Sequence, residues 1–313
     1  MAAAYSYLAT VARRLPAPIF RVVRAGGLSL LEFGRLTSNL FHLVMPSTRA
    51  ADASDPFAIV DRRALRSIYW SFVENPQELL QVRTVRQILA RERLKVLTET
   101  SDVRTASDTG SVIHNGVQYN VDGAKSAPDL DRPALMVNVV SSIERVWKNI
   151  GALDVLSIGP RSEIEIFSLL AAGFKRERVR ALDLLSYSPY VEIGNMHAMP
   201  YANDSFDVIL LGWVLAYSRD PASAAREIVR VCRNGAIVVA SADYVGERTV
   251  DTVSNFNNEE TRIRSVDQIL GYFGAVVGPV YFRHDPELPD RNMVMTAFEV
   301  RKKMPGLGAE QGG

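Results

Sequence analysis

The stretch that decides the fold reads LDVLSIGPRSEIEIFSLLAA and covers residues 153–172. Its first half contains a short apolar run, Val155–Ile158, which is typical of a buried strand. A glycine turn follows at Gly159, where the absence of a side chain permits a tight turn and a close backbone approach. The second half, Glu163–Ala172, has the apolar spacing of a helix. This pattern predicts the strand–turn–helix unit of a parallel α/β sheet.

The same alternation continues to the end of the chain. It predicts further strands at Val179–Leu182, Val191–Ile193, Phe206–Leu211, Ala236–Ala240, Val276–Phe282 and Met293–Val300. It predicts helices at Leu135–Ile150, Ala222–Val231 and Val266–Phe273. Strands that alternate with helices indicate a doubly wound, mostly parallel sheet with helices on both faces. Because no helix separates the two closing strands, we expect them to pair antiparallel.

The region before this domain has a different apolar pattern. Residues 61–97 carry the apolar period of two helices, with a break at Asn75–Pro76. Residues 98–133 are polar and rich in turns, and a short hairpin is expected around Asn115–Gly116. We therefore predict four parts: a basic amphipathic segment (1–50), a mainly helical accessory region with a linker (51–133), the α/β domain (134–301) and a disordered tail (302–313).

Composition excludes several classes of protein. The chain has 313 residues, a net charge of +1 and one cysteine, Cys232. One cysteine excludes an intramolecular disulfide framework and a cysteine-based zinc site, and the near-zero charge argues against a general nucleic-acid binder. No uncharged apolar stretch approaches the roughly 20 residues that a transmembrane helix needs, so a soluble, cytoplasmic protein is expected. Residues 1–45 alternate apolar clusters with arginines, and either pack on their own domain or lie on an anionic membrane surface.

In an open α/β sheet the ligand lies beyond the carboxyl ends of the strands. The free backbone amides after Gly159 suit a carboxylate or phosphate, and Ser162 with Glu165 forms the pattern of a helix capping box. Asp183 ends the second strand, where an acid suits the ribose hydroxyls of a nucleoside cofactor, or is a surface or capping carboxylate. A nicotinamide site needs Gly-x-Gly-x-x-Gly at the first turn, and only Gly159 is present.

A longer signal comes after the third strand. Residues 194–209 read GNMHAMPYANDSFDVI, Asp220–Pro221 comes next, and residues 226–236 read REIVRVCRNGA. In this order the segments resemble the class I S-adenosylmethionine-dependent methyltransferases, in their small-molecule branch. The resemblance covers roughly residues 135–300 and implies a Rossmann-like fold and S-adenosylmethionine as the cofactor.

The resemblance also implies where the cofactor would bind. Its contacts would be Gly159, Arg161, Glu163, Asp183, Leu184, Asn195, Met196, Gly212 and Trp213. The first motif departs from the family pattern, because Ser157 stands at the acid position and Arg161 and Glu163 replace two glycines. Asn195 replaces the acid that meets the adenine amino group, although its side-chain carbonyl can still accept that hydrogen bond. These departures leave a second hypothesis open, a methyltransferase fold that has lost catalysis and serves as a binding or scaffold protein.

The residues after the fourth strand exclude several acceptor classes. The Asn/Asp-Pro-Pro-Tyr motif of enzymes that methylate base or glutamine amines is missing there, and Cys232 lies away from the site. No acid directly follows the fourth strand, so a metal site is not expected. Metal-free O- or N-methylation of a small molecule or saccharide remains.

The catalytic candidates are Asp243, His284 and Tyr217. Trp213 is expected to form an apolar wall against the sulfonium of the cofactor. Each has a plainer interpretation: Trp213 and Tyr217 as packing beneath the site, and His284 as a solvated loop histidine. Arg83, Arg86, Arg91 and Arg93 either face an anionic acceptor or form a solvated helix face.

Overall fold

The structure is a computed structural model. It describes residues 71, 74–100, 104–106, 132–160, 162–244, 263–286 and 293–302. The chain divides into two compact units, Met1–Val85 and Arg86–Gly313. The predicted basic segment, the hairpin around Asn115–Gly116 and nearly all of the tail lie outside the described residues, so membrane docking by residues 1–45 stays a prediction. No helix in the described ranges is long and apolar enough to cross a membrane.

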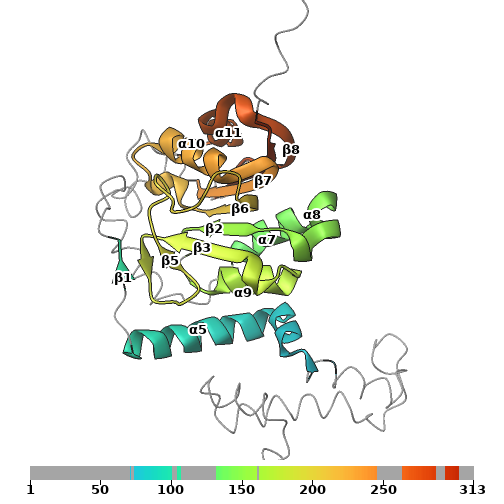
Figure 1. The fold of residues 1–313 in the computed structure, drawn as a ribbon, viewed down its shortest axis with the longest axis vertical. Helices are drawn as coiled ribbons and strands as arrows, with labels where there is room; N and C mark the ends of the chain where they lie inside the picture. The colour runs from blue at the N-terminus through green and yellow to red at the C-terminus, as the bar shows by residue number, and fades with distance from the viewer. Residues whose placement is uncertain are drawn as a thin grey trace, which may run out of the picture. The chain divides into compact units, whose positions relative to one another are not determined.

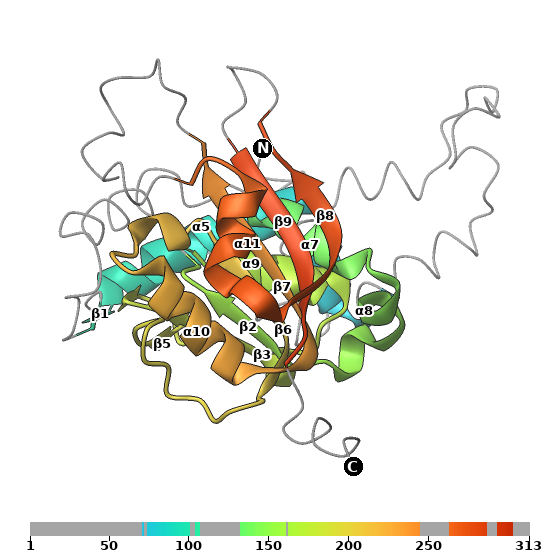
Figure 2. The same ribbon diagram turned by 90° about the horizontal axis from the view of Figure 1, so that it is seen from above.

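The second unit is built on a seven-stranded sheet in the order β5-β3-β2-β6-β7-β9-β8, which can be followed in Figures 1 and 2. The strands are β2 (Val155–Ile158), β3 (Val179–Asp183), β5 (Glu192–Ile193), β6 (Phe206–Gly212), β7 (Cys232–Asp243), β8 (Val277–His284) and β9 (Met293–Val300). Pairing is parallel from β5 to β7, and β9 is antiparallel to both of its neighbours. The predicted mostly parallel sheet with an antiparallel last strand is confirmed.

Helices cover both faces of this sheet. On one face lie α10 (Pro221–Val231) and α11 (Val266–Phe273), and on the other α7 (Pro133–Ser141) and α9 (Ile164–Ala172), as Figure 2 shows. Shorter elements are α8 (Glu144–Asn149), the 3-10 turns η2 (Ile150–Ala152), η3 (Arg176–Arg178), η4 (Leu215–Tyr217) and η6 (Gly274–Val276), and the strand pair β1 (Arg104–Thr105) and β4 (Leu185–Ser186). Before the domain, η1 (Pro76–Gln81) starts at the expected break after Asn75 and α5 covers Arg83–Thr100.

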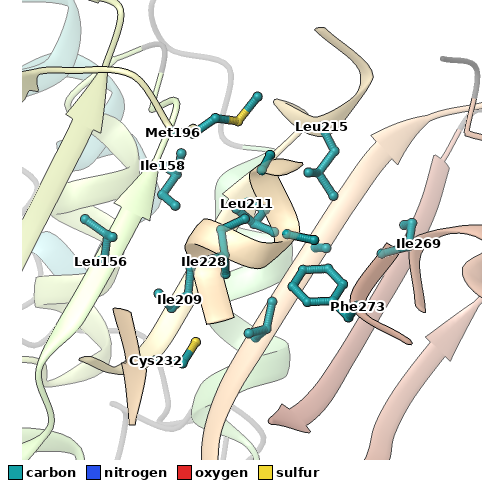
Figure 3. Packing of buried hydrophobic residues seen from close by; sticks show 14 of the residues in the cluster. Leu156, Ile158, Met196, Ile209, Leu211, Leu215, Ile228, Cys232, Ile269 and Phe273 are labelled. Carbon is teal, nitrogen blue, oxygen red and sulfur yellow. The ribbon is translucent and has the colours of Figure 1, made fainter. Parts of the chain in front are cut away.

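The burial of β6 shows why the sheet needs helices on both faces. Ile209 and Leu211 belong to the apolar cluster with α10 and α11, whereas Val208 and Leu210 belong to the cluster with α7 and α9. All four side chains are fully buried, because successive residues of a strand point to opposite faces. Figure 3 shows the first cluster, in which Ile228 and Phe273 come from the two helices. Burying each large aliphatic side chain contributes about 1.5–3 kcal/mol.

The single helix predicted over Leu135–Ile150 is wrong, because two helices occupy this stretch. α7 ends at Ser141, and Ile143 is extended (ψ 122°) before α8 begins at Glu144. The hydroxyl of Ser141 donates to the carbonyl of Val137, and that of Ser142 donates to Asn138. Two consecutive serines that bond back to the preceding turn weaken the helix there, which apolar periodicity does not reveal.

The predicted capping box at Ser162 and Glu165 is also wrong. The helix α9 begins after Glu163 without a side-chain capping bond, and Glu165 faces the sheet instead. Its Oε1 accepts a hydrogen bond of 2.5 Å from Ser157 Oγ on β2, and its Oε2 would lie 3.1 Å from a Cβ added to Gly212. Glu165 is buried, and loss of hydration raises the pKa of its carboxyl to about 7. A carboxyl thus lies beside Ser157, the position where the family carries its acid.

We expect Glu165 to make the domain less stable as the pH rises. A carboxyl whose pKa is higher in the folded than in the unfolded chain favours folding when it is protonated, so the free energy of unfolding falls between the unfolded pKa of 4.5 and about 7. The loss should total about 3 kcal/mol and level off above that range. Glu165→Gln keeps the acceptor for Ser157 without the ionisation, so its denaturation midpoints should not show this loss. Equal pH slopes in denaturant titrations of both proteins would contradict the assignment.

Candidate active site

The turn that follows β2 leads into α9 and contacts the end of β3. Gly159 has φ +75°, and its N–H donates to the carbonyl of Leu182 at 2.8 Å. A Cβ on Gly159 would lie 1.7 Å from Cγ1 of Val214, so no other residue fits without moving the chain after β6. Arg161 lies outside the described residues. The glycine therefore brings the turn close to the chain beyond β6 as well as to β3.

Glu163, at the third glycine position of the family motif, is fully buried, and both of its carboxylate oxygens accept hydrogen bonds. Its Oε2 accepts from Nε of Arg93 at 2.5 Å, and its Oε1 accepts from Nη2 of Arg93 at 3.0 Å and from Ser188 Oγ at 2.5 Å. This pairing raises the pKa of Arg93, and the guanidinium also lies 5.0 Å from the centroid of the Tyr190 ring. Arg93 belongs to α5, so a helix outside the core supplies the countercharge. Both oxygens of Glu163 are therefore used by the protein.

A second segment from outside the core lies beside the end of β3. Residues Arg104–Thr105 pair antiparallel with Leu185–Ser186, and Ala106 N–H donates to the carbonyl of Leu184 at 2.6 Å. The guanidinium of Arg104 donates to the carbonyl of Ser188 at 3.0 Å. The half-buried Leu184 thus has its carbonyl satisfied by this added strand. Composition and periodicity gave no signal for the pairing, because each partner is two residues long.

Asp183 and Asn195 lie at the same edge of the sheet. Asp183 ends β3 as a half-buried carboxylate, and its Oδ1 accepts from the N–H of Leu185 at 3.3 Å. Its carbonyl accepts from Gly194 N–H, which places Asn195 one residue beyond this contact. Met196 is buried and belongs to the apolar cluster drawn in Figure 3. Its side chain therefore packs in the core, and only its backbone is left for a ligand.

His197 ties the loop after β5 to the loop after β6. Asn195 Oδ1 lies 3.0 Å from the N–H of His197 and 2.8 Å from its Nδ1. An amide oxygen only accepts, so Nδ1 carries the proton, and Ser218 Oγ, 2.8 Å from Nε2, donates to the ring. Asp220 N–H in turn donates to Ser218 Oγ. The Asn195 carbonyl expected to meet adenine thus already accepts two hydrogen bonds.

The helix α10 holds the rest of the same loop. Glu227 Oε1 accepts from Met199 N–H at 2.7 Å, and Arg230 donates to the carbonyls of Met199 and Tyr201. The hydrogen bond with Arg230 holds the pKa of Glu227 below its usual value. These two residues are the Glu-x-x-Arg pair of the quoted segment 226–236, so its contribution here is to fix the loop that follows β5.

Trp213 and Asp243, which were predicted, meet Arg132, which was not, at the ends of β6 and β7. Trp213 follows Gly212 in the left-handed region (φ +63°), and its N–H lies 3.1 Å from the carbonyl of Ser241. The guanidinium carbon of Arg132 lies 4.3 Å from the centroid of the Trp213 ring. Nη1 of Arg132 donates to Oδ1 of Asp243 at 2.8 Å. Arg132 is not predictable from the sequence, because no motif marks it and it lies 111 positions from Asp243.

Of the other two catalytic candidates, His284 lies apart from this contact. His284 ends β8 opposite Met295, and Met295 faces Ser241 of β7 on its other side. His284 is thus two strand spacings from β7, about 10 Å between backbones. Tyr217 is half-buried in η4, where its N–H donates to the carbonyl of Val214. Within the described ranges, no group of three or more His, Cys, Asp or Glu side chains is arranged to hold a metal ion.

A cavity of about 340 Å³ lies at the opposite edge of the sheet, at the amino ends of the strands. Asp154, Arg178 and Arg233 are among its lining residues. Asp154 forms ion pairs with both arginines, at 3.0 and 2.9 Å, so these charges are neutralised within the protein. Cys232, the first residue of β7, is buried near this edge, and loss of hydration raises the pKa of its thiol to about 12. A free thiol in that state is a packing residue and a poor nucleophile.

Comparison with protein families gives a match to part of the domain. Residues 170–240 match a family described as "Methyltransferase domain". No curated protein sequence matches this chain.

Solved structures with a similar fold include an N-methyltransferase, NodS, from Bradyrhizobium japonicum in complex with S-adenosylhomocysteine (13% identity, 56% of this chain and 88% of that chain, TM-score 0.39). Two further similar structures are S-adenosylmethionine-dependent methyltransferases. One is from Aquifex aeolicus (17% identity, 54% and 98%, TM-score 0.34) and the other from Mesorhizobium loti (16% identity, 48% and 92%, TM-score 0.36). Likenesses at this level carry no inference about the acceptor.

The matched residues 170–240 run from the end of α9 into β7 and include Asp183, Asn195, Gly212 and Trp213. The sheet around them is mostly parallel and ends with the antiparallel β9. Residues 170–240, which form part of this sheet, are therefore similar to the methyltransferase domain family.

Proposed function

We propose that residues 134–301 form the catalytic domain and transfer a methyl group to a small-molecule or saccharide acceptor, on oxygen or nitrogen and without a metal. The observation that carries this proposal is the meeting of the Gly159 turn, the Asp183 carboxylate and the Trp213 backbone at one edge of the sheet. That edge is where open α/β sheets bind their ligands. The helix α5 is joined to this domain by the ion pair between Arg93 and Glu163.

The residues at this edge fit S-adenosylmethionine. Asp183 supplies carboxylate oxygens at the place where the ribose hydroxyls would donate, and each such oxygen accepts more than one hydrogen bond. The positive φ of Gly159 and its lack of a side chain let the backbone of this turn approach a ligand closely. When bound, the cofactor supplies a methyl group on a positively charged sulfur. The chain's own residues orient it and exclude water, which is most of what an in-line transfer requires.

The acceptor side is proposed to be the end of β7. Asp243 uses Oδ1 for Arg132, and its Oδ2 is the proposed acceptor of the proton that a substrate hydroxyl releases. Trp213 presents one ring face to Arg132, so a sulfonium would meet its edge or opposite face. His284 and Tyr217 remain candidates for contacts with the rest of the acceptor.

Direct titration with S-adenosylhomocysteine and S-adenosylmethionine tests cofactor use. We expect saturable heat from the wild-type protein and a 5- to 150-fold weaker affinity for Asp183→Ala and Asp183→Asn, about 1–3 kcal/mol, because ribose hydrogen bonds to a carboxylate are lost. Asp267→Ala is the matched control, since it removes an exposed carboxylate whose partner is Arg283. Folded protein that gives no heat with either compound at millimolar concentration would refute the proposed function.

The alternative is a scaffold protein whose cofactor site has degenerated. The buried Glu163–Arg93 pair favours it, because a carboxylate occupies the position of the family's third glycine. Arg161→Gly with Glu163→Gly separates the two. In a working site built on this pair, the double variant should lose affinity for S-adenosylhomocysteine, because Arg93 no longer fixes the start of α9. A gain in affinity on restoring the glycines would instead support degeneration.

A further inference from the structure

The start of α7 meets the ends of β6 and β7 in a small group of polar residues, here called the Arg132 cluster: Arg132, Trp213 and Asp243. Arg132 precedes the first residue of α7, Pro133, and Asp243 is the last residue of β7. About a third of the Arg132 side chain is exposed (32%), as is 43% of the Asp243 side chain. The cluster thus lies at the solvent side of the edge where the acceptor is proposed to bind.

Arg132 has hydrogen-bonding capacity to spare. A guanidinium has five N–H donors, and among the described residues the protein accepts only one of them, at Oδ1 of Asp243. Stacking on Trp213 fixes the plane of the guanidinium without using a donor. The cation is therefore oriented by the protein and only partly neutralised.

Trp213 carries two unusual features at the same place. Its φ of +63° lies in the left-handed region, which is costly for a residue with a bulky side chain. Its side chain is 7% exposed, and its indole N–H has no hydrogen-bond partner in the described part of the chain. Strained backbone and unsatisfied buried donors both occur preferentially at functional sites, and Trp213 combines them in one residue.

The start of α7 adds no negative charge. This nine-residue helix has no side-chain capping bond and no acidic residue in its first turn. The positive end of its dipole therefore adds to the positive charge of Arg132. Asp243 is the one acceptor in the cluster, so donors outnumber acceptors.

We propose that the Arg132 cluster binds an anionic oxygen group, a carboxylate or a phosphate, carried by the methyl acceptor. This inference rests on the proposed function, because it takes the edge beyond β6 and β7 as the acceptor side. The anionic group lies on Arg132, and the rest of the acceptor extends along Asp243. The substrate class is then an acid that also bears the hydroxyl or amine to be methylated.

The test uses the indole N–H resonance of Trp213 in ¹⁵N-labelled full-length protein, assigned by its absence in Trp213→Phe. Acetate, methyl phosphate and the neutral isostere acetamide are titrated with and without saturating S-adenosylhomocysteine. We expect acetate or methyl phosphate, but not acetamide, to shift this resonance in the presence of S-adenosylhomocysteine. The stronger of the two anions tells whether the group is a carboxylate or a phosphate.

Arg132→Gln should weaken anion binding about tenfold or more, since a charge-assisted hydrogen bond is lost. Arg301→Gln, which removes an exposed arginine paired with Glu299, should leave it within about twofold. A shift that acetamide causes equally, or that Arg132→Gln leaves intact in folded protein, would overturn the proposal. So would displacement of the anions by S-adenosylhomocysteine, because the cluster would then hold the cofactor's own carboxylate.

The same titration keeps this inference separate from the proposed function. S-adenosylhomocysteine binding is read from calorimetry on the same samples. If S-adenosylhomocysteine binds but neither anion shifts the Trp213 indole resonance, the proposal for the Arg132 cluster is refuted and the proposed function is not. Failure to bind S-adenosylhomocysteine would instead remove the proposed function on which the cluster's assignment rests.

Discussion

The burial of β2, β6 and β7 on both faces is the constraint on which the rest of the structure depends. Each of these strands places alternate side chains into two separate apolar clusters, so neither face tolerates water. Helices must then return over the sheet after each strand, and every parallel strand ends at the same edge. Charged residues are absent from the buried middle of these three strands and collect where the strands stop. That is why Gly159, Asp183, Trp213 and Asp243 come together although they span 85 positions of sequence.

Two carboxyls near the first motif show how the polar edge is built when the usual glycines and acid are absent. Glu165 lies beside Ser157, and loss of hydration raises the pKa of its carboxyl. Glu163 is just as buried but meets Arg93 through two hydrogen bonds. A buried carboxylate needs such a partner, because removing one member of a buried pair costs about 3–5 kcal/mol. The part of α5 that carries Arg93 is consequently held against the turn after β2, and both belong to the second compact unit.

Much of this arrangement could be predicted from the sequence, because it follows from local pattern. Periodicity gave β2, α11 and β9 at their observed bounds and the antiparallel pairing of β9 with β8. It failed at Ser141 and Ser142, where side-chain hydrogen bonds to the backbone end a helix that the apolar spacing continues. It also failed for Arg93 and Arg132, whose partners lie 70 and 111 positions away. Spacing identifies the edge at which side chains gather, but not which charges pair across it.

The two arginines differ in the property that decides whether a ligand can use them. The Arg93–Glu163 pair is not accessible to a ligand, because the carboxylate is fully buried. Separating the pair would leave the Glu163 charge buried with neither its partner nor water. The Arg132–Asp243 pair is about a third to two-fifths exposed, and pairs of this kind contribute only about 0–1 kcal/mol. A ligand can therefore rearrange the second pair at little cost, whereas the first resists any ligand. Burial thus separates a pair that fixes a helix to the fold from a pair that is available for recognition. On this argument the edge proposed to bind the acceptor is chemically adaptable at Arg132, and the turn beside Arg93 is held rigid.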